Sequence, residues 1–374
     1  MLNEKLKVGI IFGGQSVEHD ISILTALQVY HEIDKEKYQV IPFYITKNNE
    51  ILTHKSLFDL ETYKKENFNK CKVVTFYNEN HLLYYLDISK RRKIDYIDIF
   101  IPTVHGANIE DGTLSGYLDF LNVPYTSSDI LSSSIAQDKI VTKYVLESLK
   151  IPTLPYVTLN KNTYNHNQLS KKLDEITLPI IIKPYNLGSS IGIKIAHTLE
   201  EAYQFIMESF KYSEKLLIEP ALEQYREFNQ SIYKEISKYQ ISQIEEVSTS
   251  NELLTFTDKY INKKQNQSSR IIPADISNEL KEQISEYTKK IYSSLSFKGI
   301  IRIDYLYDNL NNKIYVNEIN TIPGSLAYYL YEISFTELID KQIKNALYEQ
   351  KQKLKYIKTF NSNVLFNKGE KLKK

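Results

Sequence analysis

The sequence predicts an α/β fold with an open sheet at its N-terminal end, followed by a part in which hairpins and helices mix. Near the N-terminus, short apolar runs alternate with segments of helical period, which is typical of a largely parallel open sheet. Further along, strand-like runs lie in pairs joined by short polar turns, which indicates antiparallel hairpins. The 374 residues are enough for two or three domains of about 150 residues each.

The composition is that of an ordinary globular protein, 42% hydrophobic and 25% charged. The formal net charge of +1 gives no electrostatic reason to expect a nucleic acid partner. Cys71 is the single cysteine, so we expect no internal disulfide and a reducing compartment. The N-terminal apolar run is too short for a signal sequence or for a span of about 20 residues, which predicts a cytoplasmic protein without membrane segments.

The first segment of the chain predicts a strand, a glycine turn and a helix. Residues 8–12 form an apolar run that suits a buried parallel strand, two glycines follow, and apolar residues recur at helical spacing from Ile21. Residues 38–45 and 95–106 predict two more strands. Ligands of open sheets bind beyond the carboxyl ends of the strands, so the glycine turn is a candidate binding position.

The middle of the chain begins with a candidate boundary at residues 121–130, which contain proline and serine. We expect one helix over 132–149 and then a strand, loop and strand over 178–195. A short strand follows at 215–222. Residues 226–248 predict an antiparallel hairpin.

The last third starts with polar residues 250–272, which lack a clear period and predict a surface loop. Residues 276–295 predict an amphipathic helix. The runs 299–308 and 312–320 predict a second hairpin. From Lys351 onward the chain is rich in lysine and predicts a solvated tail.

Oxygen-bearing side chains occur in this second hairpin, where a core strand would be apolar. Glu318 and Asn320 lie two residues apart and therefore share one face of a strand, and Asp304 on the partner strand can join them. Such ligands suit Mg²⁺, which shares its remaining positions with water and substrate phosphates. An exposed charged face is the alternative for Glu318 alone; with Arg302 also on these apolar strands, the metal site is favoured.

A glycine- and serine-containing loop follows the strand that Lys183 ends. Gly188, Ser189 and Ser190 offer backbone N–H groups and hydroxyls that suit phosphate oxygens. A generic Gly-Ser turn is the alternative reading of these three residues. The P-loop pattern GxxxxGK[ST] does not occur, so the common ATP-binding module is absent while a lysine, a glycine loop and a metal site are present.

Six motifs, in order from Lys7 to Tyr329, resemble those of the ATP-grasp enzymes, and among them the D-alanine–D-alanine ligases. They are "FGGQSVEHDIS", "HGANIEDGTLSGYLD", "LPIIIKP" with "GSSIG", "DKY", "RIDY" and "NEINTIPG". The resemblance implies an N-terminal Rossmann-like α/β domain followed by a two-subdomain ATP-grasp unit. The expected bounds are 1–125 for the N-terminal domain, 126–222 for the central lid subdomain, 223–350 for the catalytic subdomain and 351–374 for the tail.

The resemblance also implies roles on the nucleotide side. Lys139 and Lys183 would hold the ATP phosphates as point charges, Glu219 would take the adenine polar edges, and Glu227 the ribose hydroxyls. Two exposed lysines, and a salt-bridged surface glutamate at Glu227, are the alternatives. The full nucleotide set is Lys139, Lys183, Ser190, Glu219, Glu227 and Lys259. The metal set is Asp304, Glu318 and Asn320, which would hold two Mg²⁺ ions, with Mn²⁺ as a substitute.

On the substrate side, the resemblance makes Glu18 the anchor for the ammonium of the first amino acid, with Ser189 and Tyr260 tied to it. Glu18 stands at an expected helix start, so a simple capping residue is the alternative. His105 would lie nearby, with a structural histidine as its alternative. Arg302 would stabilise the oxyanion on the reacting carbon. The 250–272 loop, which carries Tyr260, would close as a lid.

Three departures from the family pattern fall on this substrate side. Ile109 stands where the family has a glycine before "EDG". The serine that follows Gly324 by five residues in the family is replaced by Tyr329, which leaves Tyr329 and Ser325 as candidates for binding the acceptor carboxylate. The lid is also shorter before "DKY", whereas the ATP side matches.

The implied activity is ATP-dependent ligation of two D-alanine molecules through an acyl phosphate, which supplies a peptidoglycan precursor for the cell wall. The partners implied are ATP and D-alanine, and the family is compatible with a homodimer. One alternative is a relative with D-serine, D-lactate or another amino acid as acceptor. A second is a nucleotide-binding regulatory protein without turnover, against which the metal ligands and Arg302 argue.

Overall fold

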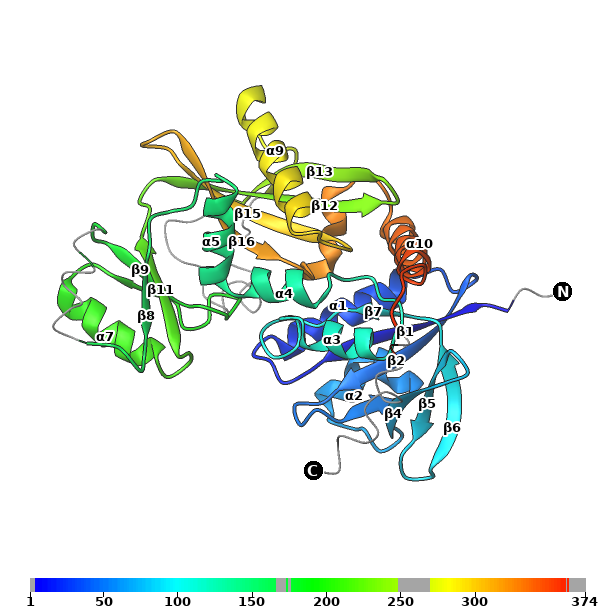
Figure 1. The fold of residues 1–374 in the computed structure, drawn as a ribbon. Helices are drawn as coiled ribbons and strands as arrows, with labels where there is room; N and C mark the ends of the chain where they lie inside the picture. The colour runs from blue at the N-terminus through cyan, green and yellow to red at the C-terminus, as the bar shows by residue number, and fades with distance from the viewer. Residues whose placement is uncertain (1–3, 166–172, 174–175, 248–269, 361, 363–374) are drawn as a thin grey trace.

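The computed structural model describes residues 4–165, 173, 176–247, 270–360 and 362. The chain folds around three sheets, and each sheet has its own hydrophobic core. Figure 1 shows the seven-stranded N-terminal sheet at the lower right, the four-stranded sheet at the left and the five-stranded sheet above them. This mixed α/β architecture confirms the predicted fold class.

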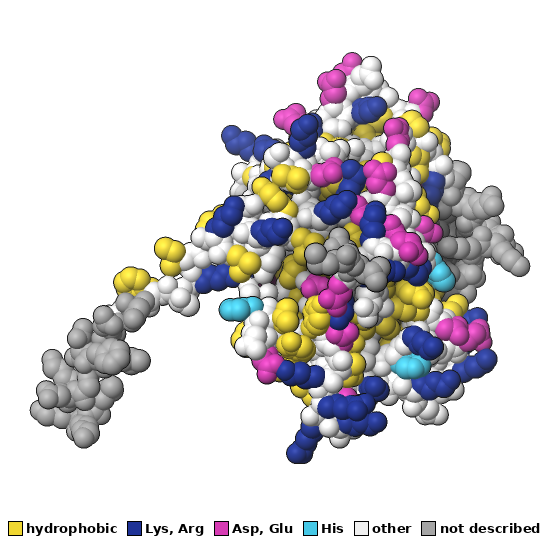
Figure 2. All heavy atoms as spheres, turned by 90° about the vertical axis from the view of Figure 1, so that its right-hand side faces the viewer, with side chains coloured by type: hydrophobic (Ala, Val, Ile, Leu, Met, Phe, Trp, Pro, Cys, Tyr) yellow, Lys and Arg dark blue, Asp and Glu magenta, His cyan; other side chains and the backbone are white. Residues whose placement is uncertain are grey.

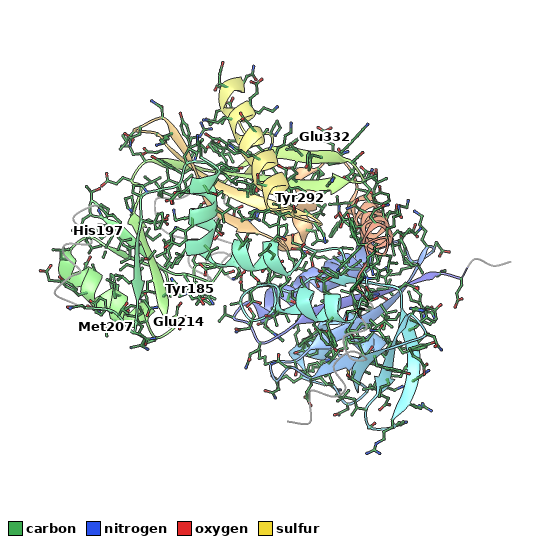
Figure 3. The ribbon with its side chains drawn as sticks, in the orientation of Figure 1. Tyr185, His197, Met207, Glu214, Tyr292 and Glu332 are labelled. Atoms are coloured by element: carbon green, nitrogen blue, oxygen red, sulfur yellow. The ribbon has the colours of Figure 1, made fainter. Side chains whose placement is uncertain are left out.

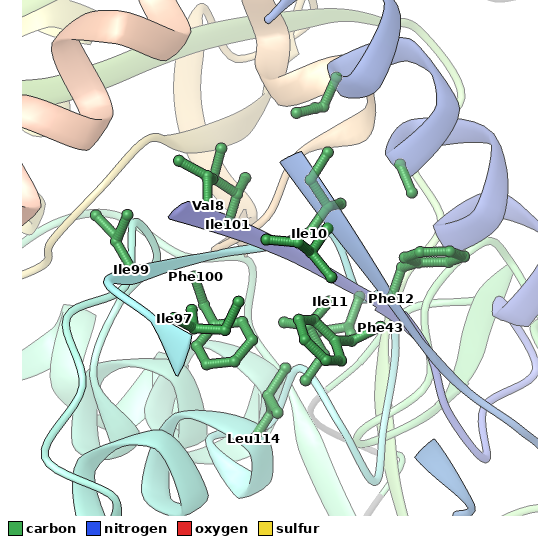
Figure 4. Packing of buried hydrophobic residues seen from close by; sticks show 14 of the residues in the cluster. Val8, Ile10, Ile11, Phe12, Phe43, Ile97, Ile99, Phe100, Ile101 and Leu114 are labelled. Carbon is green, nitrogen blue, oxygen red and sulfur yellow. The ribbon is translucent and has the colours of Figure 1, made fainter. Parts of the chain in front are cut away.

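The seven-stranded sheet has the order β6-β5-β4-β3-β2-β1-β7. Its parallel part consists of β1 (Leu6–Gly13), β2 (Tyr38–Ile45) and β7 (Ile99–Pro102), and α1 (His19–Glu32) follows β1. Figure 4 shows Ile11 of β1 and its partner Phe43 of β2 side by side in the core. The runs are apolar without interruption because both faces of these strands are buried.

The other strands of this sheet are antiparallel, and the sequence patterns did not predict them. They are β3 (Ile51–Thr53), β4 (Lys72–Glu79), β5 (Leu82–Asp87) and β6 (Arg92–Ile97). The helices of this region are η1 (Lys55–Phe58), α2 (Leu60–Lys64) and α3 (Thr113–Phe120). The single strand expected at 95–106 was wrong: Asp98 separates β6 from β7, and its carboxylate accepts a hydrogen bond from Lys7 N at 2.8 Å.

The single helix expected over 132–149 was also wrong, because two helices occupy this segment. They are α4 (Ile130–Gln137) and α5 (Lys139–Ser148), and Asp138 between them is extended with ψ 99°. The Asp138 carboxylate accepts hydrogen bonds from the first free amides of α5, Ile140 N and Val141 N, both at 3.0 Å. This cap makes Lys139 the first residue of α5.

The four-stranded sheet confirms the strand, loop and strand of 178–195 and the strand at 215–222. Its elements are β8 (Val157–Asn160), β9 (Ile180–Pro184), β10 (Lys194–Ala196), α7 (Leu199–Ser209) and β11 (Lys215–Pro220). The strand order is β10-β9-β11-β8, and every pairing is antiparallel.

The five-stranded sheet, of order β14-β13-β12-β15-β16, confirms both predicted hairpins and the amphipathic helix. Its elements are β12 (Tyr225–Glu235), β13 (Lys238–Val247), β14 (Arg270–Ile271), α9 (Asn278–Ser294), β15 (Ile301–Asp308) and β16 (Lys313–Asn320). Of the surface loop predicted at 250–272, residues 250–269 lie outside the described residues, and Arg270 and Ile271 form β14. Ala136 and Leu146 from α4 and α5 belong to the core of this sheet.

The last described elements are η2 (Gly324–Leu330) and α10 (Phe335–Lys353), so residues 351–353 of the predicted tail are helical, while residues 361 and 363–374 of it lie outside the described residues. The apolar face of α10, with Leu338 and Ile343, is buried in the core of the N-terminal sheet. Figure 2 shows acidic and basic side chains interspersed over the face that includes α10, in keeping with the small net charge. The described helices include none that is long and apolar enough to cross a membrane.

Candidate active site

Polar side chains form a row across one face of the five-stranded sheet. The strand register pairs Glu245 with Asn229, Asn229 with Asp304, and Asp304 with Glu318. Directly paired residues share a face of the sheet, so these four side chains lie side by side, and we call them the polar row. Arg302 and its partner Asn320 lie two residues further along the same two strands, on the same face.

Arg302 is fixed by a two-pronged contact inside this face. Its Nε and Nη2 donate to the two carboxylate oxygens of Asp304 at 2.6 and 2.8 Å, and Asn320 Nδ2 donates to Asp304 Oδ2 at 3.0 Å. Burial opposes the charge of Arg302, but Asp304 outweighs it and raises the pKa of the guanidinium well above its ordinary value. The structure thus holds a permanent positive charge beside the predicted metal ligands.

The two predicted phosphate-binding lysines reach this face from other elements. Lys183, at the end of β9, donates to Asn317 Oδ1 at 3.1 Å. Asn317 is the extra residue of a β-bulge, where the β15–β16 register shifts between Asp304 and Tyr305. Lys139 Nζ lies 3.8 Å from Glu318 Oε2 and donates to Leu187 O at 2.7 Å.

A buried glutamate organises a second lysine pair. Glu219 is 3% exposed, and its two oxygens lie 2.6 Å from Lys183 Nζ and 2.5 Å from Lys143 Nζ. Burial favours the neutral acid, but the two lysine charges outweigh it and lower the pKa of Glu219 to about 2. The motifs did not single out Lys143; its position four residues after Lys139, on the same helix face, is the signal that could have found it.

The loop after β9 meets the start of α1 around Glu18. Ser189 Oγ donates to Glu18 Oε1, as predicted, and within the described chain the Glu18 side chain forms no capping hydrogen bond to α1. Ser189 and Ser190 both adopt positive φ, at 52° and 60°. A Cβ on Gly188 or on Gly106 would lie 2.7 Å from Glu18 Oε2, so a larger residue at either position would have to displace the Glu18 carboxylate or the loop.

This loop can be located in Figure 3 by Tyr185, which lies on the side of the four-stranded sheet that faces the rest of the molecule. Tyr185 O accepts a hydrogen bond from Lys139 N at 2.9 Å, so the loop is attached to the first residue of α5.

Two buried titratable groups lie beyond β7. His105 Nε2 is 3.0 Å from Thr25 Oγ1, and burial together with the charge of Arg302 lowers the pKa of His105 to about 4. Glu110, which the motifs did not single out, accepts hydrogen bonds from Gly106 N at 2.8 Å and Ile322 N at 3.0 Å. Burial and the nearby Glu18 raise the pKa of Glu110 to about 7.

Ile109 is buried over the first glycine turn, since a Cβ on Gly14 would lie 3.1 Å from Ile109 Cγ1. The departure at this position therefore fills space above the turn with an apolar side chain.

The two acceptor candidates have different surroundings. The Tyr329 hydroxyl donates to Glu245 Oε2 at 3.5 Å, at the end of the polar row. Ser325 Oγ donates to Gln28 Oε1 at 2.7 Å, and the left-handed backbone of Ser325, with φ 53°, begins the irregular turn of η2 that also contains Gly324. The structure brings Tyr329, and not Ser325, into contact with the polar row.

The remaining predicted site residues are placed as follows. Glu227 on β12 pairs with Leu306 and shares the face of the polar row, since it is two residues from Asn229. Lys259 and Tyr260 lie outside the described residues. In the described part of the chain, no three His, Cys, Asp or Glu side chains cluster as a metal site; the predicted set has two carboxylates and one amide.

Comparison with known proteins gives matches that cover most of the chain. The family described as "D-ala D-ala ligase N-terminus" matches residues 7–128, and "D-ala D-ala ligase C-terminus" matches residues 145–340. The D-alanine–D-alanine ligase of Thermosipho africanus is 38% identical, over 98% of this chain and 100% of that protein. The enzyme of the same name from Caldicellulosiruptor bescii is 35% identical, over 95% and 99%.

Solved structures show the same fold. A D-alanine–D-alanine ligase from Helicobacter pylori is 27% identical with a TM-score of 0.71, covering 91% of this chain and 98% of that one. The VanG D-Ala:D-Ser ligase from Enterococcus faecalis is 26% identical with a TM-score of 0.77, covering 92% and 100%. From the two family matches and these full-length relatives, we conclude that the chain belongs to the D-alanine–D-alanine ligase family.

Proposed function

We propose that this protein is an ADP-forming D-alanine–D-alanine ligase, EC 6.3.2.4, that makes D-alanyl-D-alanine for peptidoglycan synthesis. The observation that carries the proposal is the convergence of three kinds of group at one end of the five-stranded sheet. They are the buried arginine Arg302, paired with Asp304; two lysines from separate elements, Lys139 and Lys183; and the carboxylate of Glu18, which Ser189 contacts.

The first D-alanine binds through its ammonium to Glu18, whose orientation Ser189 fixes. Its carboxylate oxygen attacks the γ-phosphorus of ATP, the bond from phosphorus to the bridging oxygen of ADP breaks, and an acyl phosphate forms. Lys139 and Lys183 neutralise the charge that spreads over the transferred phosphoryl group. Glu219 is shared between Lys143 and Lys183, so its single negative charge does not fully neutralise the positive charge of Lys183.

Asp304, Glu318 and Asn320 fit a magnesium site. Asp304 and Glu318 are directly opposite carboxylates and Asn320 adds an amide oxygen, so the three side chains offer the hard oxygen ligands that Mg²⁺ prefers. When bound there, Mg²⁺ supplies the charge neutralisation that phosphoryl transfer needs. Two ions are part of the proposal, with Mn²⁺ as a substitute.

In the second step the amine of the acceptor D-alanine attacks the acyl carbon. Arg302 stabilises the negative oxygen of the tetrahedral intermediate, inorganic phosphate leaves, and the amine loses a proton as the peptide bond forms. His105, neutral above a pKa of about 4, adds no positive charge near Arg302 at neutral pH. Adenine contact through Glu219, ribose contact through Glu227, and the roles of Lys259, Tyr260 and Ser190 remain predictions.

The test is turnover by the purified protein with ATP and a panel of acceptors, followed by identification of the product. We expect D-alanyl-D-alanine with one ADP and one phosphate for each bond formed. If none of the amino acids on the panel gives phosphate release, the protein is a nucleotide-binding relative without turnover. A preference for D-serine, or for D-lactate over D-alanine at neutral pH, would reassign the acceptor.

Two further parts of the proposal concern the setting of the enzyme. We propose a cytoplasmic location, where ATP is available, and a homodimer, as the family resemblance implies. Light scattering of the purified protein measures its mass in solution and decides between a monomer and a dimer.

A further inference from the structure

The polar row ends, on the side away from Glu318, at an arginine that no sequence motif indicates. Arg270 lies on β14, and its Nε is 3.3 Å from Glu245 Oε1. The centre of its guanidinium lies 4.9 Å from the centroid of the Tyr329 ring. The Arg270 side chain is 53% exposed, whereas Glu245 is 1% exposed. A buried carboxylate thus fixes an accessible guanidinium over an aromatic ring.

Each contact of this group restricts the orientation of the guanidinium. Glu245 is itself held by Asn229 Nδ2, which donates to Oε2 at 3.1 Å, and the Tyr329 hydroxyl donates to the same oxygen at 3.5 Å. The contact of the guanidinium with the Tyr329 ring, a cation–π interaction, further restricts its position. Because the contact with Glu245 involves Nε, the accessible part of the side chain includes the fork of terminal N–H groups.

The acceptor of the proposed reaction has one group that such a fork recognises. An amino acid that attacks through its amine keeps its own carboxylate, and the planar guanidinium of arginine matches a carboxylate with two parallel hydrogen bonds. The charges of both Arg302 and Arg270 act on the Tyr329 phenol, so Tyr329 is near the oxyanion arginine as well as Arg270. An acceptor whose amine lies toward Arg302 would extend its carboxylate toward Arg270, the other arginine whose charge acts on Tyr329.

We propose that Arg270 binds the carboxylate of the acceptor amino acid, with Tyr329 and Glu245 as positioning residues that aim the guanidinium. This inference rests on the proposed ligase function and adds to it the residue that selects acceptors with a free carboxylate. It also assigns Tyr329 the role of a platform for Arg270, in place of a direct ligand of the substrate.

The same sheet carries a matched control. Arg226 on β12 lies 4.9 Å above the Phe228 ring, and its Nε and Nη2 donate to Glu246 at 2.7 Å each. Glu246 follows Glu245 in β13, so the two side chains point to opposite faces of the sheet. Arg226 is thus an arginine of the same kind, stacked and ion-paired, on the face away from the polar row.

The experiment compares two acceptors in the wild-type protein and in Arg270→Met, with Arg226→Met as the control. D-Alanine has a carboxylate, whereas D-alaninamide does not; the amide also cannot accept a phosphoryl group, so it serves as acceptor only. We expect the wild type to prefer D-alanine as acceptor, and Arg270→Met to raise the acceptor KM by ten- to a hundredfold and remove most of that preference. Arg226→Met should retain the wild-type acceptor KM and the preference for D-alanine. The KM for ATP should be the same in all three proteins.

Arg270→Lys retains the charge without the fork and should restore part of the preference, and it also serves if Arg270→Met does not fold. An unchanged acceptor KM and an unchanged preference in either folded variant would overturn the inference. If the wild type uses another amino acid instead of D-alanine, that amino acid and its amide take the place of this pair. The D-alanine assignment then fails, while the role of Arg270 in binding the acceptor carboxylate is still tested. If no amino acid supports turnover, both the ligase function and the role of Arg270 are overturned.

Discussion

Glu318 is the residue whose charge can be tested with least disturbance of the fold, because it lies at the end of the polar row on a partly exposed strand. Glu318→Gln should nearly abolish phosphoryl transfer, since a neutral amide neutralises Mg²⁺ poorly. The melting temperature should change little. Single-turnover release of ADP from ATP measures the step directly, and normal turnover in the variant would remove Glu318 from the metal site.

Gly188 gives a second prediction at this scale. A Cβ there would lie 2.7 Å from Glu18 Oε2, the end of a flexible side chain, and Gly188 is not among the glycines with positive φ. Gly188→Ala should therefore displace the Glu18 carboxylate at small cost in stability. We expect the KM for the first D-alanine to rise about tenfold or more while the melting temperature stays within a few degrees, roughly 1 kcal/mol. A large fall in melting temperature would show that the loop, and not Glu18, absorbs the clash.

Tyr329 and Ser325 can be separated by two conservative variants. Tyr329→Phe keeps the ring under Arg270 and removes the hydroxyl that reaches Glu245, so it should weaken acceptor binding by roughly 1 kcal/mol, at the lower end of the cost of a lost hydrogen bond. Ser325→Ala removes a contact with Gln28 and should leave the acceptor KM unchanged. Initial rates at varied acceptor concentration give the acceptor KM of both variants. An unchanged acceptor KM in Tyr329→Phe with a raised one in Ser325→Ala would assign acceptor binding to Ser325.

The residues that were predicted from the sequence and those that were missed differ in a physical respect. Glu18, Ser189 and Arg302 stand in ordered motifs, and a motif can be read in one segment at a time. Glu245 stands in no motif. Glu110 stands in the second motif, but its role comes from contacts with distant segments, such as the one with Ile322, which is 212 residues away. No periodicity within one segment encodes such a contact, so only the folded chain shows it.

At the scale of elements, the break between α4 and α5 controls the position of Lys139, for which we propose a phosphate-binding role. Asp138 caps α5 through two hydrogen bonds at 3.0 Å, and Lys139 follows it directly. Asp138→Ala should lower the free energy of unfolding by about 1 kcal/mol, the usual cost of a lost N-cap, and should raise the KM for ATP. Asp138→Asn, which keeps a capping oxygen, should restore most of both. Urea unfolding and ATP kinetics measure the two effects, and an unchanged KM in Asp138→Ala would show that the cap does not position Lys139.

The elements also show where sequence patterns are informative. β1 and β2 were predicted because buried parallel strands are continuous apolar runs. β3 has three residues, and β4 alternates weakly between half-exposed and buried positions, so neither forms a strong period. Over residues 132–149 the apolar residues continue past Asp138, so the sequence pattern predicts a single helix. The break is made by Asp138, which ends α4 and caps α5.

At the scale of the whole molecule, Glu110 joins the N-terminal part of the chain to the turn after β16. Its Oε2 accepts from Gly106 N and its Oε1 from Thr321 Oγ1 and Ile322 N. Burial and Glu18 raise its pKa from 4.5 to about 7, so between these values the folded protein retains a proton that the unfolded chain has lost. Its contribution to stability therefore falls as pH rises from about 4.5 to 7 and is constant above that range.

Glu110→Gln removes this titration and leaves the other groups in place. We expect the free energy of unfolding of the variant, relative to wild type, to rise between pH 5 and pH 8, which urea unfolding at the two pH values measures. His105, whose lowered pKa gives the opposite slope between about 4 and 6.5, is present in both proteins and cancels in the difference. A difference that does not change with pH would mean that Glu110 is ionised in the folded protein throughout.

The burial of α10 in the core of the first sheet has a consequence for synthesis of the chain. Val8 and Ile10 in β1 emerge from the ribosome long before Leu338 and Ile343, which share their core. The N-terminal sheet therefore remains without part of its cover until α10 has been translated. During that interval its apolar face is open to chaperones and to neighbouring nascent chains, and a premature stop before Phe335 leaves it open permanently.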